Sequence, residues 1–123
     1  MKHINFYEGR VSLRASYMQV GADLVVIVSG GDEAHVGAAS LSGPGESHSV
    51  SFAHHREQEL TQPMAEALAL ALRRKVLVVA GMHWRRFDAD MLAEVRQAWQ
   101  ELTQELIEHL GTTVFNVLPG AAE

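Results

Sequence analysis

Residues 24–31 read Leu-Val-Val-Ile-Val-Ser-Gly-Gly, a continuous apolar run followed by a serine and two glycines. A run of this length that is rich in β-branched residues and bounded by glycine predicts a central strand covered on both faces. The residues before it, 21–23, and those after its apolar part, 29–32, have the composition of turns. This segment therefore indicates the middle of a β-sheet.

Four further segments in the first half of the chain predict strands: residues 4–8, 11–19, 35–41 and 47–52. In the second of these, apolar and polar side chains alternate, which is typical of a strand with one buried face. Because tight turns join consecutive strands, we expect an antiparallel meander.

The second half of the chain changes to a helical period. Between residues 57 and 74, large apolar side chains recur at intervals of four, as on one face of an amphipathic helix. Pro63 has no backbone N–H and is expected in the first turn, so the helix is predicted to begin near Thr61 or Gln62.

A short strand and a second helix are predicted after the first helix. The apolar residues 76–79 predict the strand, and residues 80–81 are expected to end it. Asp88 has the character of a helix N-cap, and Gly111 is the expected stop at the other end.

Residues 112–118 predict a last edge strand, and residues 119–123 predict a frayed tail. The order of elements indicates an α+β fold with a mainly antiparallel sheet core and two amphipathic helices. A doubly wound sheet would need alternating βαβ units instead. We expect a single domain over residues 1–123, with an ordered core at about 3–118.

Composition excludes several classes of protein. The chain has 123 residues, of which 47% are hydrophobic and 20% charged, as in ordinary globular domains. The absence of cysteine excludes disulfide scaffolds, thiolate zinc sites and iron–sulfur clusters. The net charge of −5 argues against nucleic-acid binding. Neither a membrane span nor a signal peptide is visible, so we expect a cytoplasmic protein without membrane partners.

The first candidate site is the segment 29–37. Gly30 and Gly31 would free backbone N–H groups to hold a phosphate, with His35 close by. The alternative is a hairpin in which the glycines only supply positive φ angles. The segment is neither a Walker loop nor a dinucleotide fingerprint, because no helix follows it.

The second candidate site is the pair His54 and His55, just before the first helix. Histidines at this position could ligate a metal, donate to a phosphate or titrate near neutral pH. The alternative is a solvated loop.

The third candidate site is the segment 81–88. Trp84 could stack on a planar ring system, while Arg85 or Arg86 binds a phosphate through two hydrogen bonds. In the alternative, Trp84 packs at the start of the second helix and both arginines face water.

At these residues the chain resembles a known family. The shared elements are Gly21-x-Asp23-Leu24, Gly30-Gly31-x-x-x-His35-Val36-Gly37, His55-Arg56-Glu57 and Ala80-Gly81-Met82-His83. In order and spacing they cover about residues 10–110, and they resemble the bacterial prenylated-flavin chaperones of the gallate decarboxylase type.

The resemblance implies a fold like that of proteasome assembly chaperones, often dimeric, and a role beside decarboxylases that use prenylated FMN. The cofactor-binding positions that it implies are Gly30, Gly31, His35, Gly37, His55 and His83. Chemistry alone adds Trp84, Arg85 and Arg86 to this set.

The leading hypothesis is a chaperone, rather than an independent catalyst, that binds prenylated FMN or FMN. It would deliver the flavin to a prenylated-flavin-dependent decarboxylase or support its maturation there. One alternative adds a divalent metal held by His35, His55 and His83. Another is a dimeric assembly factor that binds a decarboxylase and no small molecule. We expect a homodimer, because the edges of an open sheet need cover.

Overall fold

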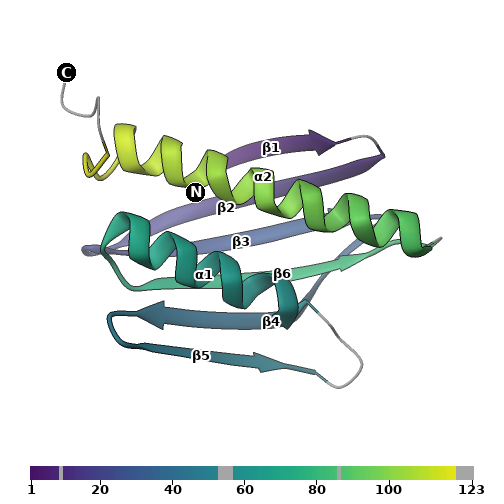
Figure 1. The fold of residues 1–123 in the computed structure, drawn as a ribbon, viewed down its shortest axis with the longest axis horizontal. Helices are drawn as coiled ribbons and strands as arrows, with labels where there is room; N and C mark the ends of the chain where they lie inside the picture. Colours follow the sequence, from purple (N-terminus) through teal and green to yellow (C-terminus); the bar gives the residue numbers. More distant parts are fainter. Residues whose placement is uncertain (9, 53–56, 86, 119–123) are drawn as a thin grey trace.

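One six-stranded sheet with both helices on the same face forms the fold (Figure 1). The computed structural model describes residues 1–8, 10–52, 57–85 and 87–118. The elements are β1 (Lys2–Glu8), β2 (Val11–Val20), β3 (Asp23–Gly31), β4 (Glu33–Gly43), β5 (Glu46–Ser51), α1 (Gln58–Leu72), β6 (Val76–His83) and α2 (Ala89–Thr113). The predicted α+β class, with two helices and a mainly antiparallel sheet, is confirmed.

The strand order across the sheet is β1-β2-β3-β6-β4-β5. All neighbouring pairs are antiparallel except β3 and β6, which are parallel. The predicted meander is therefore correct from β1 to β3 and from β4 to β5, but wrong between β3 and β4. The strand β6 lies there because it and β3 carry the most continuous apolar runs, and pairing them at the centre buries the most apolar surface.

A single hydrophobic core fills the space between the sheet and the helices. Alternate residues of β2, from Val11 to Tyr17, face the helices and are buried, as the alternation predicts. The predicted helical stripes also face the core. Their fully or nearly fully buried members are Met64, Leu68 and Leu72 on α1 and Met91, Val95, Trp99, Leu102 and Leu106 on α2.

The first helix begins at Gln58, earlier than predicted. Its first turn is closed by the backbone N–H groups of Leu60 and Thr61, which both donate to the carbonyl of Glu57. Pro63 therefore lies inside the helix, where it removes one backbone hydrogen bond. Its side chain is exposed, so the ring does not disturb the packed face of α1.

Two predicted strand ends were wrong. The strand β6 continues past residues 80–81 to His83, because Gly81 pairs with Ser29 of β3. The strand β3 likewise includes both glycines of the predicted turn, so Asp32 alone separates it from β4.

The predicted strand at residues 112–118 is absent. The helix α2 runs through Gly111 to Thr113, and the chain then folds back onto it. The backbone N–H groups of Val117 and Leu118 donate to the carbonyl of Gly111 at 2.8 and 3.2 Å. Gly111 permits this return because a side chain there would collide with Leu118. The predicted tail, residues 119–123, lies outside the described residues.

The predicted N-cap of α2 is confirmed. An Asp88 carboxylate oxygen accepts the backbone N–H of Met91 at 2.7 Å. Arg10, beside β2, reaches the same oxygen at 3.1 Å and Glu94 at 2.6 Å. The Met91 N–H, followed by the Arg10 guanidinium, holds the pKa of the Asp88 carboxyl below its usual value of 3.8.

In the described part of the chain, no helix is long and apolar enough to cross a membrane.

Replacing Leu102 by alanine is expected to lower the free energy of unfolding by about 2–5 kcal/mol, because a fully buried side chain leaves a cavity. Leu70→Ala is the matched control. Leu70 is 84% exposed on α1, and its loss should change stability by less than about 0.5 kcal/mol. Urea denaturation measures both values, and equal losses in the two variants would contradict this description of the core.

Asp88→Asn should make folding less sensitive to acid. The depressed pKa means that the Asp88 charge stabilises the fold above the unfolded pKa, and that this contribution disappears as pH falls through the folded pKa. Asparagine keeps an acceptor for Met91 but loses the charge. The native protein should therefore melt at a higher temperature than the variant at about pH 6, with the difference vanishing near about pH 2. If the difference in melting temperature persists at about pH 2, the stabilisation does not come from the Asp88 charge.

Candidate functional site

A cavity of about 350 Å³ lies at the C-terminal end of β6. We call it the β6 cavity; its lining residues are His35, Glu57, Glu59, Leu60, Met82, His83, Trp84, Phe87, Leu92, Val95 and Arg96. They come from the end of β6, a bulge in β4 and the N-terminal parts of both helices. Figure 1 shows these four chain segments at the same end of the molecule, on the right.

A bulge in β4 brings His35 to the cavity. The register between β4 and β6 shifts between Ala34 and Ala38, so the residues between them leave the regular ladder. Gly81 permits the bulge, since a Cβ built on it would lie 1.9 Å from the His35 carbonyl oxygen. The lack of a side chain at Gly81 thus allows β4 to place His35 at the cavity.

Glu57 pairs with His35 at the cavity wall. The His35 Nε2 and Glu57 Oε1 atoms are 3.2 Å apart, and the side chains are 30% and 10% exposed respectively. A Cβ on Gly37 would lie 2.8 Å from the Glu57 carboxylate, so the glycine makes room for this buried acid. Gly81 and Gly37 therefore both make room for the pair formed by His35 and Glu57.

Two aromatic rings form one side of the cavity. Trp84 and Phe87 are stacked, with ring centroids 6.1 Å apart and planes inclined by 30°. Asp32 holds the chain on both sides of Trp84. Its backbone N–H donates to the His83 carbonyl at 2.7 Å, and its carboxylate accepts the Arg85 N–H at 2.7 Å. The cavity therefore has aromatic rings in its wall, which planar ligands commonly contact.

The rest of the wall is largely aliphatic with an ion pair beside it. Met82 and Val95 are buried, and Leu60 and Leu92 are half-buried. The guanidinium of Arg96 and the Glu59 carboxylate are 3.8 Å apart, and both side chains are more than half exposed. A mainly apolar cavity with a few polar groups is the usual form of a small-molecule site.

The helix N-termini add a favourable field for anions. The cavity is lined by the first residues of α1 and by residues of the first two turns of α2. The positive ends of both helix dipoles thus point toward this end of the molecule. They oppose the negative charge that the Glu57 and Glu59 carboxylates bring to the same wall.

The structure brings together three of the predicted site residues, because His35, His83 and Trp84 all line the cavity. Gly37 lies behind the wall, next to Glu57. Arg85 is exposed and does not line the cavity. The predicted residues His55 and Arg86 lie outside the described residues.

Gly30 and Gly31 have a packing role in the sheet and do not line the cavity. A Cβ on Gly30 would lie 2.5 Å from the Ser12 carbonyl oxygen, and one on Gly31 would lie 2.4 Å from that of His83. Gly31 also has a φ of +78°, which favours glycine. That these residues hold a phosphate stays a prediction.

A metal site is not apparent in the described residues, which exclude His55. Within residues 1–8, 10–52, 57–85 and 87–118, no three histidine, aspartate or glutamate residues are placed to hold a metal ion. His35 and His83 both line the cavity. The predicted three-histidine ligand set thus depends on His55.

Sequence reasoning missed most of the cavity lining. Leu92 and Arg96 lie one position after buried residues of the α2 stripe, Met91 and Val95. Their spacing of four residues shows that they share a helix face, but nothing local shows that this face borders a cavity. Phe87 had a signal, because it lies three residues after Trp84 in an aromatic segment.

The fold and the cavity define a small α+β protein with a mainly apolar cavity that has aromatic residues in its wall. The sequence model of the prenylated flavin chaperone LpdD-like domain matches residues 7–111. The chain therefore belongs to the prenylated flavin chaperone LpdD-like family, as the shared glycine and histidine elements predict.

Solved structures confirm the predicted fold. One similar structure is a novel chaperone complex for yeast 20S proteasome assembly, with 13% sequence identity and a TM-score of 0.59. The match covers 89% of this chain and 98% of the other. At this identity the likeness concerns the fold alone. A comparison with curated protein sequences finds no match.

Gly81→Ala should destabilise the fold by about 3 kcal/mol or more, because its Cβ would meet backbone atoms that cannot move aside. Gly43→Ala is the matched control in the neighbouring strand. Its Cβ would lie 3.2 Å from a flexible Lys75 side chain, so the cost should stay below about 1 kcal/mol. Thermal melting compares the two variants. A melting temperature of Gly81→Ala close to that of the native protein would contradict the close approach of β4 to β6.

Proposed function

We propose that the chain binds prenylated FMN in the β6 cavity. As a chaperone it would deliver this flavin to a prenylated-flavin-dependent decarboxylase, or support its maturation there. The observation that carries the proposal is the stacked pair Trp84 and Phe87 beside an aliphatic wall in a cavity of about 350 Å³. Membership of the prenylated flavin chaperone family supports the same ligand.

The residues present fit such a ligand. The isoalloxazine is a large planar ring system, for which Trp84 and Phe87 offer a stacking surface. The prenyl-derived part is apolar and suits the aliphatic residues Met82 and Val95. The size of the cavity also lies in the range of about 300–1,000 Å³ that is usual for small-molecule sites.

Arg96 is the candidate for the phosphate. Its present partner, Glu59, is 3.8 Å away and exposed, so their mutual attraction is weak. A phosphate could replace that carboxylate and accept two hydrogen bonds from the guanidinium. His35 and His83 could donate further hydrogen bonds to flavin oxygens or to the phosphate.

A carrier must release what it binds. We therefore expect micromolar dissociation, which corresponds to a binding free energy of about −8 kcal/mol. The exposure of His83 and Phe87 is consistent with a ligand that can leave without unfolding of the chain.

Trp84→Leu should weaken binding of prenylated FMN about tenfold, because leucine keeps an apolar side chain but loses ring stacking. Isothermal titration calorimetry with FMN and with prenylated FMN, without oxygen, measures the dissociation constant. His48→Ala on β5 is the control: this exposed histidine does not line the cavity, so binding should be unchanged. If the native protein binds neither flavin, the proposal is wrong and the alternative of an assembly factor that binds only a protein is favoured.

The same titration distinguishes the metal-dependent alternative. Chelator treatment should leave flavin binding unchanged if the described residues suffice. A metal would instead be assigned to the site if chelation abolishes flavin binding and one divalent cation restores it. In that case the His55→Ala variant should not regain binding when the cation is added.

A further inference from the structure

A second cavity, of about 610 Å³, lies between the β4–β5 hairpin and the C-terminal half of α1. We call it the hairpin cavity; it is lined by residues 42–47 of the hairpin and by Glu66, Ala69, Leu70 and Arg73 of α1. Figure 1 shows the hairpin turn and the end of α1 on the left, whereas the segments of the β6 cavity lie on the right. The two cavities therefore lie at opposite ends of the molecule.

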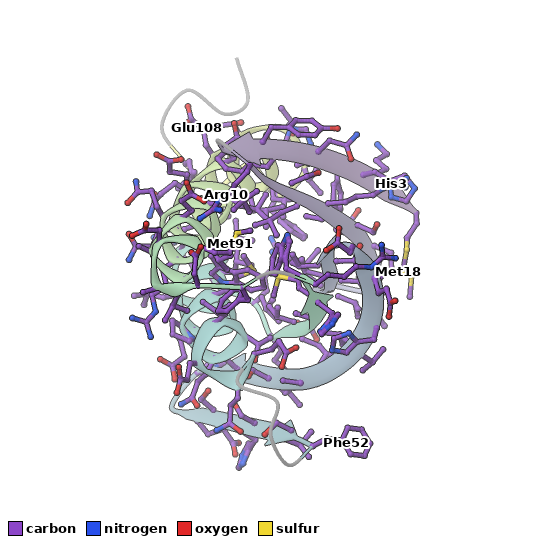
Figure 2. All side chains as sticks on the ribbon, turned by 90° about the vertical axis from the view of Figure 1, so that its right-hand side faces the viewer. His3, Arg10, Met18, Phe52, Met91 and Glu108 are labelled. Atoms are coloured by element: carbon purple, nitrogen blue, oxygen red, sulfur yellow. The ribbon has the colours of Figure 1, made fainter. Side chains whose placement is uncertain are left out.

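Serine side chains of the hairpin face α1. In the register of β4 and β5, Ser40 is opposite Ser49, and Ser42 is opposite Ser47. The Ser40 hydroxyl is 2.8 Å from that of Thr61 on α1, so this pair faces the helices, which Figure 2 shows on one side of the curved sheet. Because side chains two residues apart in a strand share a face, the second pair lies on the same side.

The two serine pairs differ in their hydrogen bonds. The Ser40 and Ser49 hydroxyls are 2.6 Å apart, and each also has a partner on α1. Neither the Ser42 nor the Ser47 hydroxyl has a hydrogen-bond partner in the part of the chain that the structure describes. Ser42 is nevertheless only 4% exposed, and the Ser47 Oγ atom is buried. Buried polar groups are normally hydrogen-bonded, so two without partners beside a cavity indicate a place for a ligand.

The packing of β5 against α1 leaves the same gap. The Ser49 hydroxyl donates to the Gln62 side chain at 3.2 Å. One step along, Ser47 lies two residues from Ser49 and Glu66 lies four residues from Gln62. These steps match in length, at about 6.7 Å along the strand and about 6 Å along the helix. The Ser47 hydroxyl and the Glu66 carboxylate are nevertheless not bonded to each other, and the hairpin cavity lies there.

The charges around the hairpin cavity favour a cation. Glu46 and Glu66 bring two carboxylates to it, and α1 ends beside it, where the helix dipole is negative. Glu66 accepts a hydrogen bond from the neutral Gln62 amide at 3.1 Å, which leaves its charge in place. Arg73 also lines the cavity, but within the described residues it forms no ion pair with either carboxylate. An anion would be repelled by the carboxylates and by the helix end.

The lining favours an organic cation over a metal ion. Within residues 1–8, 10–52, 57–85 and 87–118, no three histidine, aspartate or glutamate residues are placed to hold a metal. The α1 side of the cavity is instead partly aliphatic, with Ala69 and Leu70, and Leu70 is 84% exposed. A ligand with a charged head and an apolar chain would use both kinds of surface.

We propose that the hairpin cavity binds an aliphatic primary amine in its protonated form. The ammonium group has three N–H donors, and the Ser42 and Ser47 hydroxyls and the Glu66 carboxylate can each accept one. The aliphatic chain would lie against Ala69 and Leu70. The site goes beyond flavin binding, because none of its residues lines the β6 cavity.

Nuclear magnetic resonance of the ¹⁵N-labelled protein, titrated with n-butylammonium chloride at about pH 7, tests the proposal. An alkylammonium, like lysine, is protonated at this pH. The amides of Gly43, Gly45 and Ser47 should shift and saturate with a dissociation constant in the millimolar range, as suits a ligand with so few atoms. The control ligand is 1-butanol, which has the same chain without the charge and should cause no saturable shift.

Two variants test the polar contacts. Glu66→Gln should weaken butylammonium binding about threefold, because an exposed carboxylate contributes little more than that to an ion pair. Ser42→Ala should weaken it about tenfold, through loss of a buried hydrogen bond to a charged group. Glu105→Gln is the matched control, since Glu105 is an exposed carboxylate of α2 outside the cavity, and it should bind as the native protein does.

Thermal melting without the amine tests the serine hydroxyls separately. Ser42→Ala should melt at or above the temperature of the native protein, because it removes a buried hydroxyl that has no partner. Ser40→Ala should melt lower, because the hydroxyl that it removes is bonded to Ser49 and Thr61.

Four results would overturn the proposal. They are the absence of saturable shifts with butylammonium, equal shifts with 1-butanol, unchanged affinity in Glu66→Gln, and shifts concentrated at Met82 and Val95. The last result would place the amine in the β6 cavity instead. Glu66 is exposed, so its variant is expected to fold and keeps the test decisive even if Ser42→Ala does not fold.

Discussion

The close approach of β4 to Gly81 is the constraint on which the site depends. The strand β6 is inserted between β3 and β4, and at Gly81 its neighbour passes so near that no side chain fits. The bulge in β4 arises at this point and brings His35 to the cavity. Because the contact is between two backbones, small side-chain adjustments cannot replace it.

The remaining parts of the site follow from where β6 ends. Its last residues lie beside the N-termini of α1 and α2, which bring a buried acid, an arginine and aliphatic side chains to the same cavity. Asp32 holds the chain after β6 through two backbone groups, and so positions the aromatic segment. The cavity combines aromatic rings, apolar side chains and one arginine, and on these we base the proposal of a phosphorylated aromatic cofactor.

The sequence predicted those features that depend on neighbours in the chain. The buried stripes of both helices and the Asp88 cap follow from local periodicity and hydrogen bonding, and the structure has them. The place of β6 between β3 and β4 was not predictable in this way, because it depends on pairing between segments far apart in the chain. His35, His83 and Trp84 could be named as candidates because each lies in a distinctive local segment. Arg96 could not, because only the packing of distant segments brings it to the cavity.

The central claim is that the β6 cavity is the flavin site. Nuclear magnetic resonance of the ¹⁵N-labelled protein, with and without saturating prenylated FMN, tests it most directly. The account predicts that the largest shifts occur at the Trp84 indole N–H and at the amides of Met82 and Val95. Shifts confined to residues away from the cavity, such as Leu41 on β4 and Val50 on β5, or no shifts at saturating flavin, would contradict it.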